Sequence, residues 1–352
     1  MIADVTSEAE TIGEPLLRIR DLRVGFPAAG GSVLEAVRGL DLDLSRGEVL
    51  GIVGESGSGK SLAMLASLGL QARSAVVSGS VVFKQKELVG CPRKEMRRLR
   101  GSQIGMIFQD PLSSLNPVMT VGDQIREALF LHNRGLSTAK ATERAIELLK
   151  LVAIPQADRR LKQYPHEFSG GMRQRVMIAM AIANNPELLV ADEPTTALDV
   201  TVQAQIMRML RELKEKLGLA LVLITHDLGV VAGHADRVAV IYAGRVIEEA
   251  TVGELFANPR HPYTRGLIAS IPDLRGSQGK LYSIPGSAPA LGQLPPGCAF
   301  HPRCGYAKDI CRLVEPQDVR VGAHRSACHF AAELPAWTGV ARTEALEPTH
   351  NG

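Results

Sequence analysis

The sequence predicts an α/β protein with a mostly parallel central sheet. The first observation is that short, nearly continuous apolar runs recur along the chain, as is typical of strands buried on both faces of a sheet. The second is that helical patterns separate these runs, which is the alternation that builds a parallel sheet. The runs lie at 48–54, 104–109, 187–192 and 219–226, and the helical patterns include 61–70, 121–132 and 138–152.

The segments around this core differ from it. Residues 16–44 include the alternating stretch "LDLDL", which predicts a half-buried antiparallel sheet. Residues 238–250 predict a late hairpin that turns at Ala243–Gly244. After about residue 260, prolines and cysteines accumulate and helical periodicity fades. The expected organisation is a flexible tail at 1–15, a main domain at 16–260, a small cysteine-containing extension at 261–335 and a tail at 336–352.

Composition excludes several classes of protein. Hydrophobic residues make up 45% of the 352 residues, which predicts a globular chain with a real core. The net charge of +3 is too small to suggest nucleic-acid binding over the whole surface. No apolar run approaches the roughly 18 residues of a membrane span, and the acidic N-terminus lacks an apolar signal region. We therefore expect a cytosolic protein, in which disulfides are rare.

The stretch "GESGSGKS" at 54–61 has the spacing of a phosphate-binding P-loop. Its glycines allow the backbone to curl so that successive N–H groups point at phosphate oxygens, and the following helix adds its positive N-terminal end. Lys60 is expected to reach the β- and γ-phosphates and Ser61 to ligate Mg²⁺. The predicted nucleotide-binding residues here are Gly54, Glu55, Ser56, Gly57, Ser58, Gly59, Lys60, Ser61 and Leu62.

Polar residues also follow three other predicted strands. Asp192 ends one strand, where a Mg²⁺-holding aspartate is expected, and Glu193 follows it, placed to polarise an attacking water. His226 ends the strand after it, and Gln109 ends an earlier one as a metal and water contact. Because ligands of open α/β sheets bind at the carboxyl ends of the strands, these residues are expected to converge with Lys60. The predicted chemistry is Mg²⁺-dependent ATP hydrolysis.

A second phosphate-binding helix start is predicted at "HEFSGGM", residues 166–172. Ser169 is a good N-cap, and Gly170 and Gly171 leave backbone N–H groups bare. An ordinary capped helix would explain Ser169 but not the paired glycines. Because the chain already has a P-loop, this second phosphate-binding helix start is suited to the γ-phosphate of a nucleotide held by another subunit.

Together these motifs, with "ADEP" at 191–194, "ALD" at 197–199 and His226, resemble the ATP-binding cassette (ABC) family over residues 16 to about 255. The resemblance implies a RecA-like P-loop core, an antiparallel β subdomain and a helical subdomain at about 110–185. It implies that two cassettes pair head to tail, each ATP lying between the P-loop of one and the Ser–Gly–Gly signature of the other. Asp199 would then lie at the dimer seam, and Phe26 would stack on adenine. Phe168 and Met172 depart from the usual LSGGQ-type signature.

Further stretches narrow the resemblance to the oligopeptide/dipeptide permease branch. They are "FQDPLSSLNPVMTVGDQI", "NPRHPYTRGLIASIP" and the closing "PPGCAFHPRC" segment. The resemblance implies a peptide importer, with nickel chelates or another small solute as the alternative cargo. It implies as partners a second cassette, for which a paralogue is favoured, two transmembrane permease subunits and an extracytoplasmic binding protein. The chain would lie at the cytoplasmic face of the inner membrane. A repair or translation ATPase is disfavoured because the chain lacks a long coiled-coil insertion and a second cassette.

Four of the five cysteines lie in the extension: Cys298, Cys304, Cys311 and Cys328. Their spacing is wider than the Cys–x–x–Cys pairs of zinc ribbons, which counts against simple zinc. Four cytosolic thiols on Pro/Gly-rich loops suit a [4Fe–4S] cluster, which is the favoured hypothesis. Zinc, with histidines as further ligands, and metal-free packing thiols are the alternatives.

The basic run at 93–101, "RKEMRRLRG", has two interpretations. One is a contact with nucleic acid or a lipid headgroup. The other, which we favour from the sequence, is a solvated helix face near the membrane side.

Overall fold

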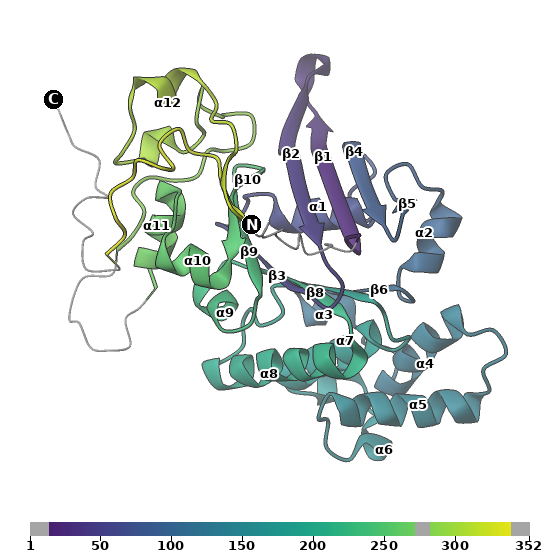
Figure 1. Cartoon of the computed structure of the whole chain (residues 1–352). Helices are drawn as coiled ribbons and strands as arrows, with labels where there is room; N and C mark the ends of the chain where they lie inside the picture. Colours follow the sequence, from purple (N-terminus) through teal and green to yellow (C-terminus); the bar gives the residue numbers. More distant parts are fainter. Residues whose placement is uncertain (1–13, 272–281, 339–352) are drawn as a thin grey trace, which may run out of the picture.

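The computed structural model describes residues 14–271 and 282–338. The predicted tails at 1–15 and 336–352 therefore lie almost entirely outside the described residues. Within them, the predicted fold class is confirmed: a mixed central sheet, a separate antiparallel sheet and a helical layer (Figure 1).

The antiparallel sheet comes first in the chain. Its strand order is β2-β1-β4-β5, and every pairing in it is antiparallel. The strands are β1 (Leu17–Pro27), β2 (Val33–Leu44), β4 (Val76–Phe83) and β5 (Lys86–Glu87). The predicted antiparallel sheet is confirmed, and in it Leu17 pairs with Leu44 and Phe26 with Leu34. Its leucines pack into one apolar cluster with α1 and the inner strands of the central sheet.

The central sheet has the strand order β11-β12-β10-β9-β3-β8-β7-β6. The strands from β9 to β6 run parallel, and the others join antiparallel at the β9 edge. The parallel strands are β3 (Val49–Val53), β6 (Ile104–Ile107), β7 (Leu188–Asp192), β8 (Ala220–Thr225) and β9 (Arg237–Tyr242). The fully buried β3, β7 and β8 correspond to the apolar runs of the sequence.

Helices cover the sheet and form a layer below it (Figure 1). The longer helices are α1 (Lys60–Ser67), α4 (Val121–His132), α5 (Thr138–Leu151), α7 (Gly170–Ala181), α8 (Val200–Leu217) and α11 (Pro262–Ala269). The shorter ones are α2 (Arg93–Leu99), α3 (Pro111–Ser114), α6 (Ala157–Arg160), α9 (Leu228–Ala232), α10 (Val252–Ala257) and α12 (Asp309–Leu313). Thr120, Ser137, Ser169 and Asp199 each cap a helix by accepting a hydrogen bond from a backbone N–H two or three residues into it. In the described part of the chain no helix is long and apolar enough to cross a membrane.

The cysteine-containing extension is joined to the central sheet. The predicted hairpin is confirmed: β9 and β10 (Arg245–Thr251) turn at Ala243 and Gly244, whose φ angles are 46° and 81°. From the extension, β12 (His324–Ser326) then pairs with β10, and β11 (Val319–Val321) pairs with β12. Three short 3₁₀ turns at Ala29–Gly31, Pro165–Glu167 and His301–Arg303 complete the elements.

Candidate functional site

The P-loop runs from the carboxyl end of β3 into α1. A Cβ atom on Gly54 would lie 2.2 Å from the carbonyl oxygen of Ile241, so no larger residue fits there. Gly57 has a φ of 79°, and a Cβ on it would meet nothing within 4 Å, which leaves the loop tip open to a ligand. Ser58 is buried and its Oγ has no hydrogen-bond partner among the described residues. A buried hydroxyl without a partner is costly, so this loop suits a phosphate that would supply one.

Lys60 lies in this loop and is only 4% exposed. Its Nζ donates hydrogen bonds to the carbonyl oxygens of Gly54 and Glu55, at 2.7 and 2.8 Å. Burial lowers the pKa of Lys60, and the carboxylates of Glu193, Asp192 and Glu55 partly offset that effect. A cation held by neutral carbonyls is available to an anionic ligand.

The Ser61 Oγ donates a hydrogen bond of 2.7 Å to Asp192 Oδ1. Burial raises the pKa of Asp192, as does the neighbouring Glu193, while the Ser61 hydrogen bond and Lys60 act in the opposite direction. A serine hydroxyl and a carboxylate side by side are the hard oxygen ligands that suit Mg²⁺, which takes its remaining ligands from phosphate and water. Ser61 and Asp192 thus lie side by side, and their role as Mg²⁺ ligands stays a prediction.

Glu193 is the centre of the polar contacts at this edge. Its carboxylate accepts hydrogen bonds from Gln109 Nε2 at 3.0 Å and from Thr196 Oγ1 at 2.8 Å. His226 Nδ1 lies 3.4 Å from its other oxygen. Burial alone would raise the pKa of Glu193, but the Thr196 and His226 contacts and nearby positive charge hold it below its usual value. The result is an ionised carboxylate with a fixed orientation.

The structure therefore brings Lys60, Ser61, Asp192, Glu193, Gln109 and His226 together at one sheet edge. Thr196 is a further member of this group that was not predicted from the sequence, where the available signal was its position three residues after Glu193. Glu193 itself has a φ of 46°, and its N–H donates to the carbonyl oxygen of Ile224 on β8. This left-handed backbone conformation turns the Glu193 side chain back toward Gln109 and His226.

The Ser–Gly–Gly segment forms a second polar group at the start of α7. Ser169 accepts a hydrogen bond from Met172 N, and Asp199 caps the neighbouring α8. Gly170 approaches Leu198, where a Cβ would find ordinary contact at 3.7 Å, but a Cβ on Gly171 would lie 2.7 Å from Val202. Ser169, Gly170 and Asp199 are exposed. The two glycines therefore differ. Close packing against Val202 explains why position 171 holds a glycine, whereas nothing near position 170 would exclude a larger residue.

The remaining predicted contacts are spread along the loop and the first sheet. Ser56 is exposed, Leu62 is half-buried on α1, and Phe26 is half-buried at the end of β1. The roles of these residues in nucleotide binding stay predictions.

Two residues of the extension reach the P-loop, and the sequence analysis missed both. The Tyr263 hydroxyl accepts a hydrogen bond of 2.9 Å from Glu55 N. Arg303 forms an ion pair of 3.0 Å with the Glu55 carboxylate, and its side chain is only 6% exposed. Arg303 also donates to the Tyr242 hydroxyl and to the carbonyl oxygen of Pro285. The extension thus contacts the phosphate-binding loop directly.

The four extension cysteines line one cavity of about 20 Å³, together with His301 and His329. They are free thiols. Burial raises the pKa of Cys298, raises that of Cys328 to about 11 and that of Cys304 to about 12. Among the described residues, no group of three or more His, Cys, Asp or Glu side chains is arranged to hold a metal ion.

Comparisons with known proteins agree with this architecture. A family model described as ABC transporter matches residues 37–196, and one described as the C-terminal region of oligopeptide/dipeptide transporters matches residues 247–311. The chain also resembles a dimeric ATP-binding cassette, MJ0796, solved with ADP and phosphate. The TM-score is 0.60 at 29% identity, covering 67% of this chain and 98% of that one.

Curated relatives match almost the whole chain. The oligopeptide transport ATP-binding protein OppD of Salmonella typhimurium is 49% identical over 94% of this chain and 98% of its own. OppD of Bacillus subtilis is 52% identical over 87% and 86%. The dipeptide transport ATP-binding protein DppD of Lactococcus lactis is 47% identical over 96% and 95%. The chain therefore belongs to the ABC transporter family, in the group of oligopeptide and dipeptide transport ATP-binding proteins.

Proposed function

We propose that this chain is the ATP-hydrolysing subunit that energises import of oligopeptides or dipeptides across the cytoplasmic membrane. Relatives named for oligopeptide and dipeptide transport support the cargo class, since they match over nearly their full length. The observation that carries the hydrolytic activity is the ionised Glu193, fixed by Gln109 and Thr196 beside the Ser61–Asp192 pair. Nickel chelates or another small solute are the alternative cargo.

In this proposal each residue at the sheet edge has one task. Lys60 and the P-loop N–H groups bind the β- and γ-phosphates. Ser61 and Asp192 would hold Mg²⁺, which would supply neutralising charge for the transferred phosphoryl group. Glu193 orients and polarises the attacking water, and His226 and Gln109 position it. Phe26 stacks on the adenine ring. Because the γ-phosphoryl group needs little covalent help, these positioning and electrostatic tasks suffice for hydrolysis.

The exposed Ser–Gly–Gly segment supports pairing with a second cassette. Ser169 and Gly170 present a bare helix start that no part of the described chain covers with an anion, and Asp199 lies exposed beside it. A second cassette, a paralogue in our proposal, would bring its own bound ATP to this face. The assembly would also contain two membrane permease subunits and an extracytoplasmic binding protein, which reads the cargo. The chain would be peripheral at the cytoplasmic face.

The first test is Glu193→Gln in the assembled transporter. The amide preserves the shape of the side chain but removes the negative charge that polarises water, so turnover should fall by about a hundredfold or more. ATP binding should remain, because Lys60 and the P-loop are unchanged. Glu187→Gln is the matched control. Glu187 directly precedes the first residue of β7, far along the strand from Glu193, and it pairs with Arg46 and Lys84 at the surface. Wild-type turnover in Glu193→Gln would overturn the assignment.

We also propose that Cys298, Cys304, Cys311 and Cys328 hold a [4Fe–4S] cluster with a structural role. Support comes from four thiols that line one cavity, one of them buried and three half-buried, because such a cluster needs four thiolates and little secondary structure. Once bound, the cluster would supply covalent cross-links between the loops.

The test is to purify the chain without oxygen and to measure visible absorbance, iron, sulfide and zinc. About four irons and four sulfides per chain, with a broad visible band, are expected. Cys311→Ser should lose that iron, whereas Cys91→Ser, which changes the cysteine outside the extension, should keep it. If the chain contains one zinc and no sulfide, the cysteines bind a structural zinc ion and not a cluster. If it contains no metal, the four thiols only pack in the extension.

A further inference from the structure

Helix α2 separates two basic hollows on the surface. One, of about 470 Å³, lies between α2 and the segment after α1 and includes Arg73, Arg93 and Arg100 in its lining. The other, of about 570 Å³, lies between α2 and the end of α4. Its lining consists of Lys94, Arg97, Arg98, Arg100, Leu131, His132 and Arg134. Arg100 lines both hollows, and neither lining includes a carboxylate.

The cations of the two hollows lack counter-charges. In the described part of the chain, none of these arginines, nor Lys94, forms an ion pair, although eighteen ion pairs occur elsewhere. Glu95 is the acidic residue of α2, and it is already paired with Lys86. Burial lowers the pKa of Arg100, and the like charges of Arg93 and Arg97 lower it further. Within residues 14–271 and 282–338, no carboxylate is therefore paired with this cluster of cations.

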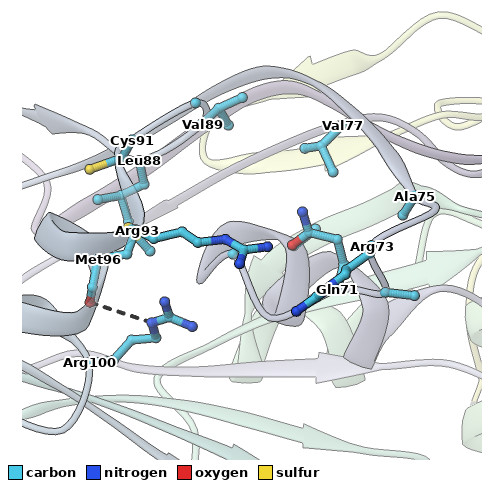
Figure 2. Close-up of a pocket in the computed structure, with 14 residues that line it drawn as sticks. Gln71, Arg73, Ala75, Val77, Leu88, Val89, Cys91, Arg93, Met96 and Arg100 are labelled. Carbon is cyan, nitrogen blue, oxygen red and sulfur yellow. Dashed lines mark hydrogen bonds between the residues drawn. The ribbon is translucent and has the colours of Figure 1, made fainter.

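Figure 2 shows how the first hollow is arranged. The guanidinium groups of Arg93 and Arg100 extend from the α2 side toward the opposite wall, where Gln71 and Arg73 lie. Arg100 Nε donates only a long hydrogen bond of 3.4 Å, to the carbonyl oxygen of Met96. Gln71 Oε1 is buried without a hydrogen-bond partner among the described residues. The hollow therefore offers several guanidinium donors and one unmet acceptor.

We propose that this pair of hollows, which we call the α2 site, binds a phosphate ester that also carries a hydroxyl group. Guanidinium groups bind phosphate oxygens through paired, charge-assisted hydrogen bonds. The hydroxyl would satisfy Gln71 Oε1, and Arg100, shared by both hollows, would bridge two anionic groups. The chemistry fits a glycerophosphate headgroup of an anionic lipid or a soluble phosphate ester. The site is separate from the P-loop, since its lining contains no residue of 54–61.

The test uses the full chain with its P-loop saturated by ADP and Mg²⁺. Two probes are compared: glycerol 3-phosphate by calorimetry, and phosphatidylglycerol vesicles against phosphatidylcholine vesicles by co-sedimentation. Arg93→Gln/Arg100→Gln should weaken binding of the preferred probe by about tenfold or more, since it removes two charged donors. Arg93→Gln/Arg97→Gln changes two exposed side chains and should do the same without risk to folding. The matched control is Arg208→Gln/Lys216→Gln, which removes two exposed cations from α8.

The outcomes separate the sources. If the chain binds phosphatidylglycerol vesicles but not glycerol 3-phosphate, the ligand is a lipid headgroup. If it binds glycerol 3-phosphate as tightly as it binds the vesicles, the ligand is a soluble phosphate ester. The proposal is overturned if neither probe binds, or if the α8 control loses as much affinity as the α2 variants. In the latter case the binding would follow net charge and not this site.

Discussion

At the residue scale, Glu55 has two anchors outside the P-loop that it belongs to. Its N–H donates to Tyr263, and its carboxylate pairs with Arg303. Arg303 is held in turn by Tyr242 and lies within 6 Å of the Tyr242 and Phe300 ring centres. Since Arg303 lies between Cys298 and Cys304 in the chain, the conformation of the cysteine segment and that of the P-loop are physically connected.

This connection predicts the behaviour of Arg303→Met. The substitution leaves the Glu55 carboxylate without its partner, which should lower the free energy of unfolding by about 1–3 kcal/mol. It should also raise the KM for ATP by roughly fivefold to tenfold, because an uncompensated negative charge then faces the phosphates. Steady-state ATPase kinetics and urea unfolding would measure the two effects.

A second substitution separates the electrostatic effect from a structural one. Glu55→Gln in the Arg303→Met background removes the unpaired charge, so it should restore most of the ATP affinity. Asp318→Asn is the control, because it breaks another ion pair of the extension, with Arg325, that does not involve the P-loop. If Glu55→Gln fails to restore KM in the double variant, Arg303 acts only through folding.

At the element scale, the start of α7 contains two glycines with different surroundings. A Cβ on Gly171 would press on Val202 of α8, whereas a Cβ on Gly170 would be tolerated. Gly170→Ala should therefore leave the free energy of unfolding within about 1 kcal/mol of wild type. It should still reduce the ATPase rate of the assembled transporter by about tenfold, because a methyl group would block close approach of a partner's phosphate.

Gly171→Ala is expected to behave differently. Overpacking against Val202 should lower the free energy of unfolding by about 1–3 kcal/mol. Val202→Ala in the Gly171→Ala background should restore part of the lost free energy of unfolding, because it makes room for the added methyl group. Thermal melting of the four proteins, with ATPase assays on the same samples, would show whether stability and activity separate as expected. Equal losses of stability in Gly170→Ala and Gly171→Ala would contradict this account of the two glycines.

The elements also show what the sequence could predict. The buried strands β3, β7 and β8 and the helices α4 and α5 follow directly from apolar runs and helical periodicity, because burial on both faces or on one stripe leaves a clear pattern. Strand β12 could not be predicted, since "HRS" is short, polar and charged. It is buried beside β10, where Glu248 accepts from His324 and Glu249 pairs with Arg325. Contacts between residues about 76 positions apart leave no local pattern.

The same limit applies to the site. Lys60, Ser61, Asp192 and Glu193 follow strands with recognisable local spacing, so their convergence was predictable. Tyr263 and Arg303 contact Glu55 from more than 200 positions away, and nothing near them in the sequence indicates a phosphate site. Their positions depend on how the extension packs, which is a property of the folded chain.

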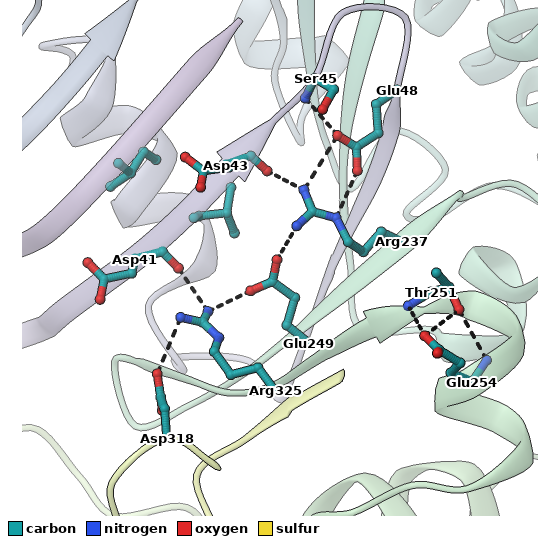
Figure 3. A network of polar contacts seen from close by, with 12 residues as sticks. Asp41, Asp43, Ser45, Glu48, Arg237, Glu249, Thr251, Glu254, Asp318 and Arg325 are labelled. Carbon is teal, nitrogen blue, oxygen red and sulfur yellow. Dashed lines mark hydrogen bonds and ion pairs between the residues drawn. The ribbon is translucent and has the colours of Figure 1, made fainter. Parts of the chain in front are cut away.

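At the scale of the whole molecule, a network of charges connects three parts of the chain (Figure 3). Arg237 on β9 pairs with Glu48 at 2.8 Å and also with Glu249 on β10. Arg325 of the extension pairs with Glu249 at 2.6 Å and donates to the carbonyl oxygen of Asp41 on β2. Glu249 is 11% exposed and is shared by both arginines. The network thus ties the antiparallel sheet and the extension to the central sheet.

Glu249→Gln should weaken this tie. It leaves two largely buried guanidinium groups with one carboxylate fewer, which should lower the free energy of unfolding by about 2–4 kcal/mol. Glu254→Gln is the matched control on the next helix, because Glu254 is exposed and its contacts stay within the Thr251 capping box shown beside the network (Figure 3). That variant should unfold at nearly the same urea concentration as the wild type, because an exposed carboxyl contributes little to stability.

The single tryptophan, Trp337, lies two residues after the extension, and Arg265 of the extension lies over its ring. Its fluorescence therefore reports the extension, while far-UV circular dichroism reports the helices and sheets. In the wild type the two urea transitions should coincide, as expected for one cooperative unit. In Glu249→Gln the fluorescence transition should move to lower urea, ahead of the dichroism transition, because the extension loses its attachment first. If Glu249→Gln unfolds like Glu254→Gln by both measurements, the network does not hold the extension, and the pairing of β12 with β10 must suffice on its own.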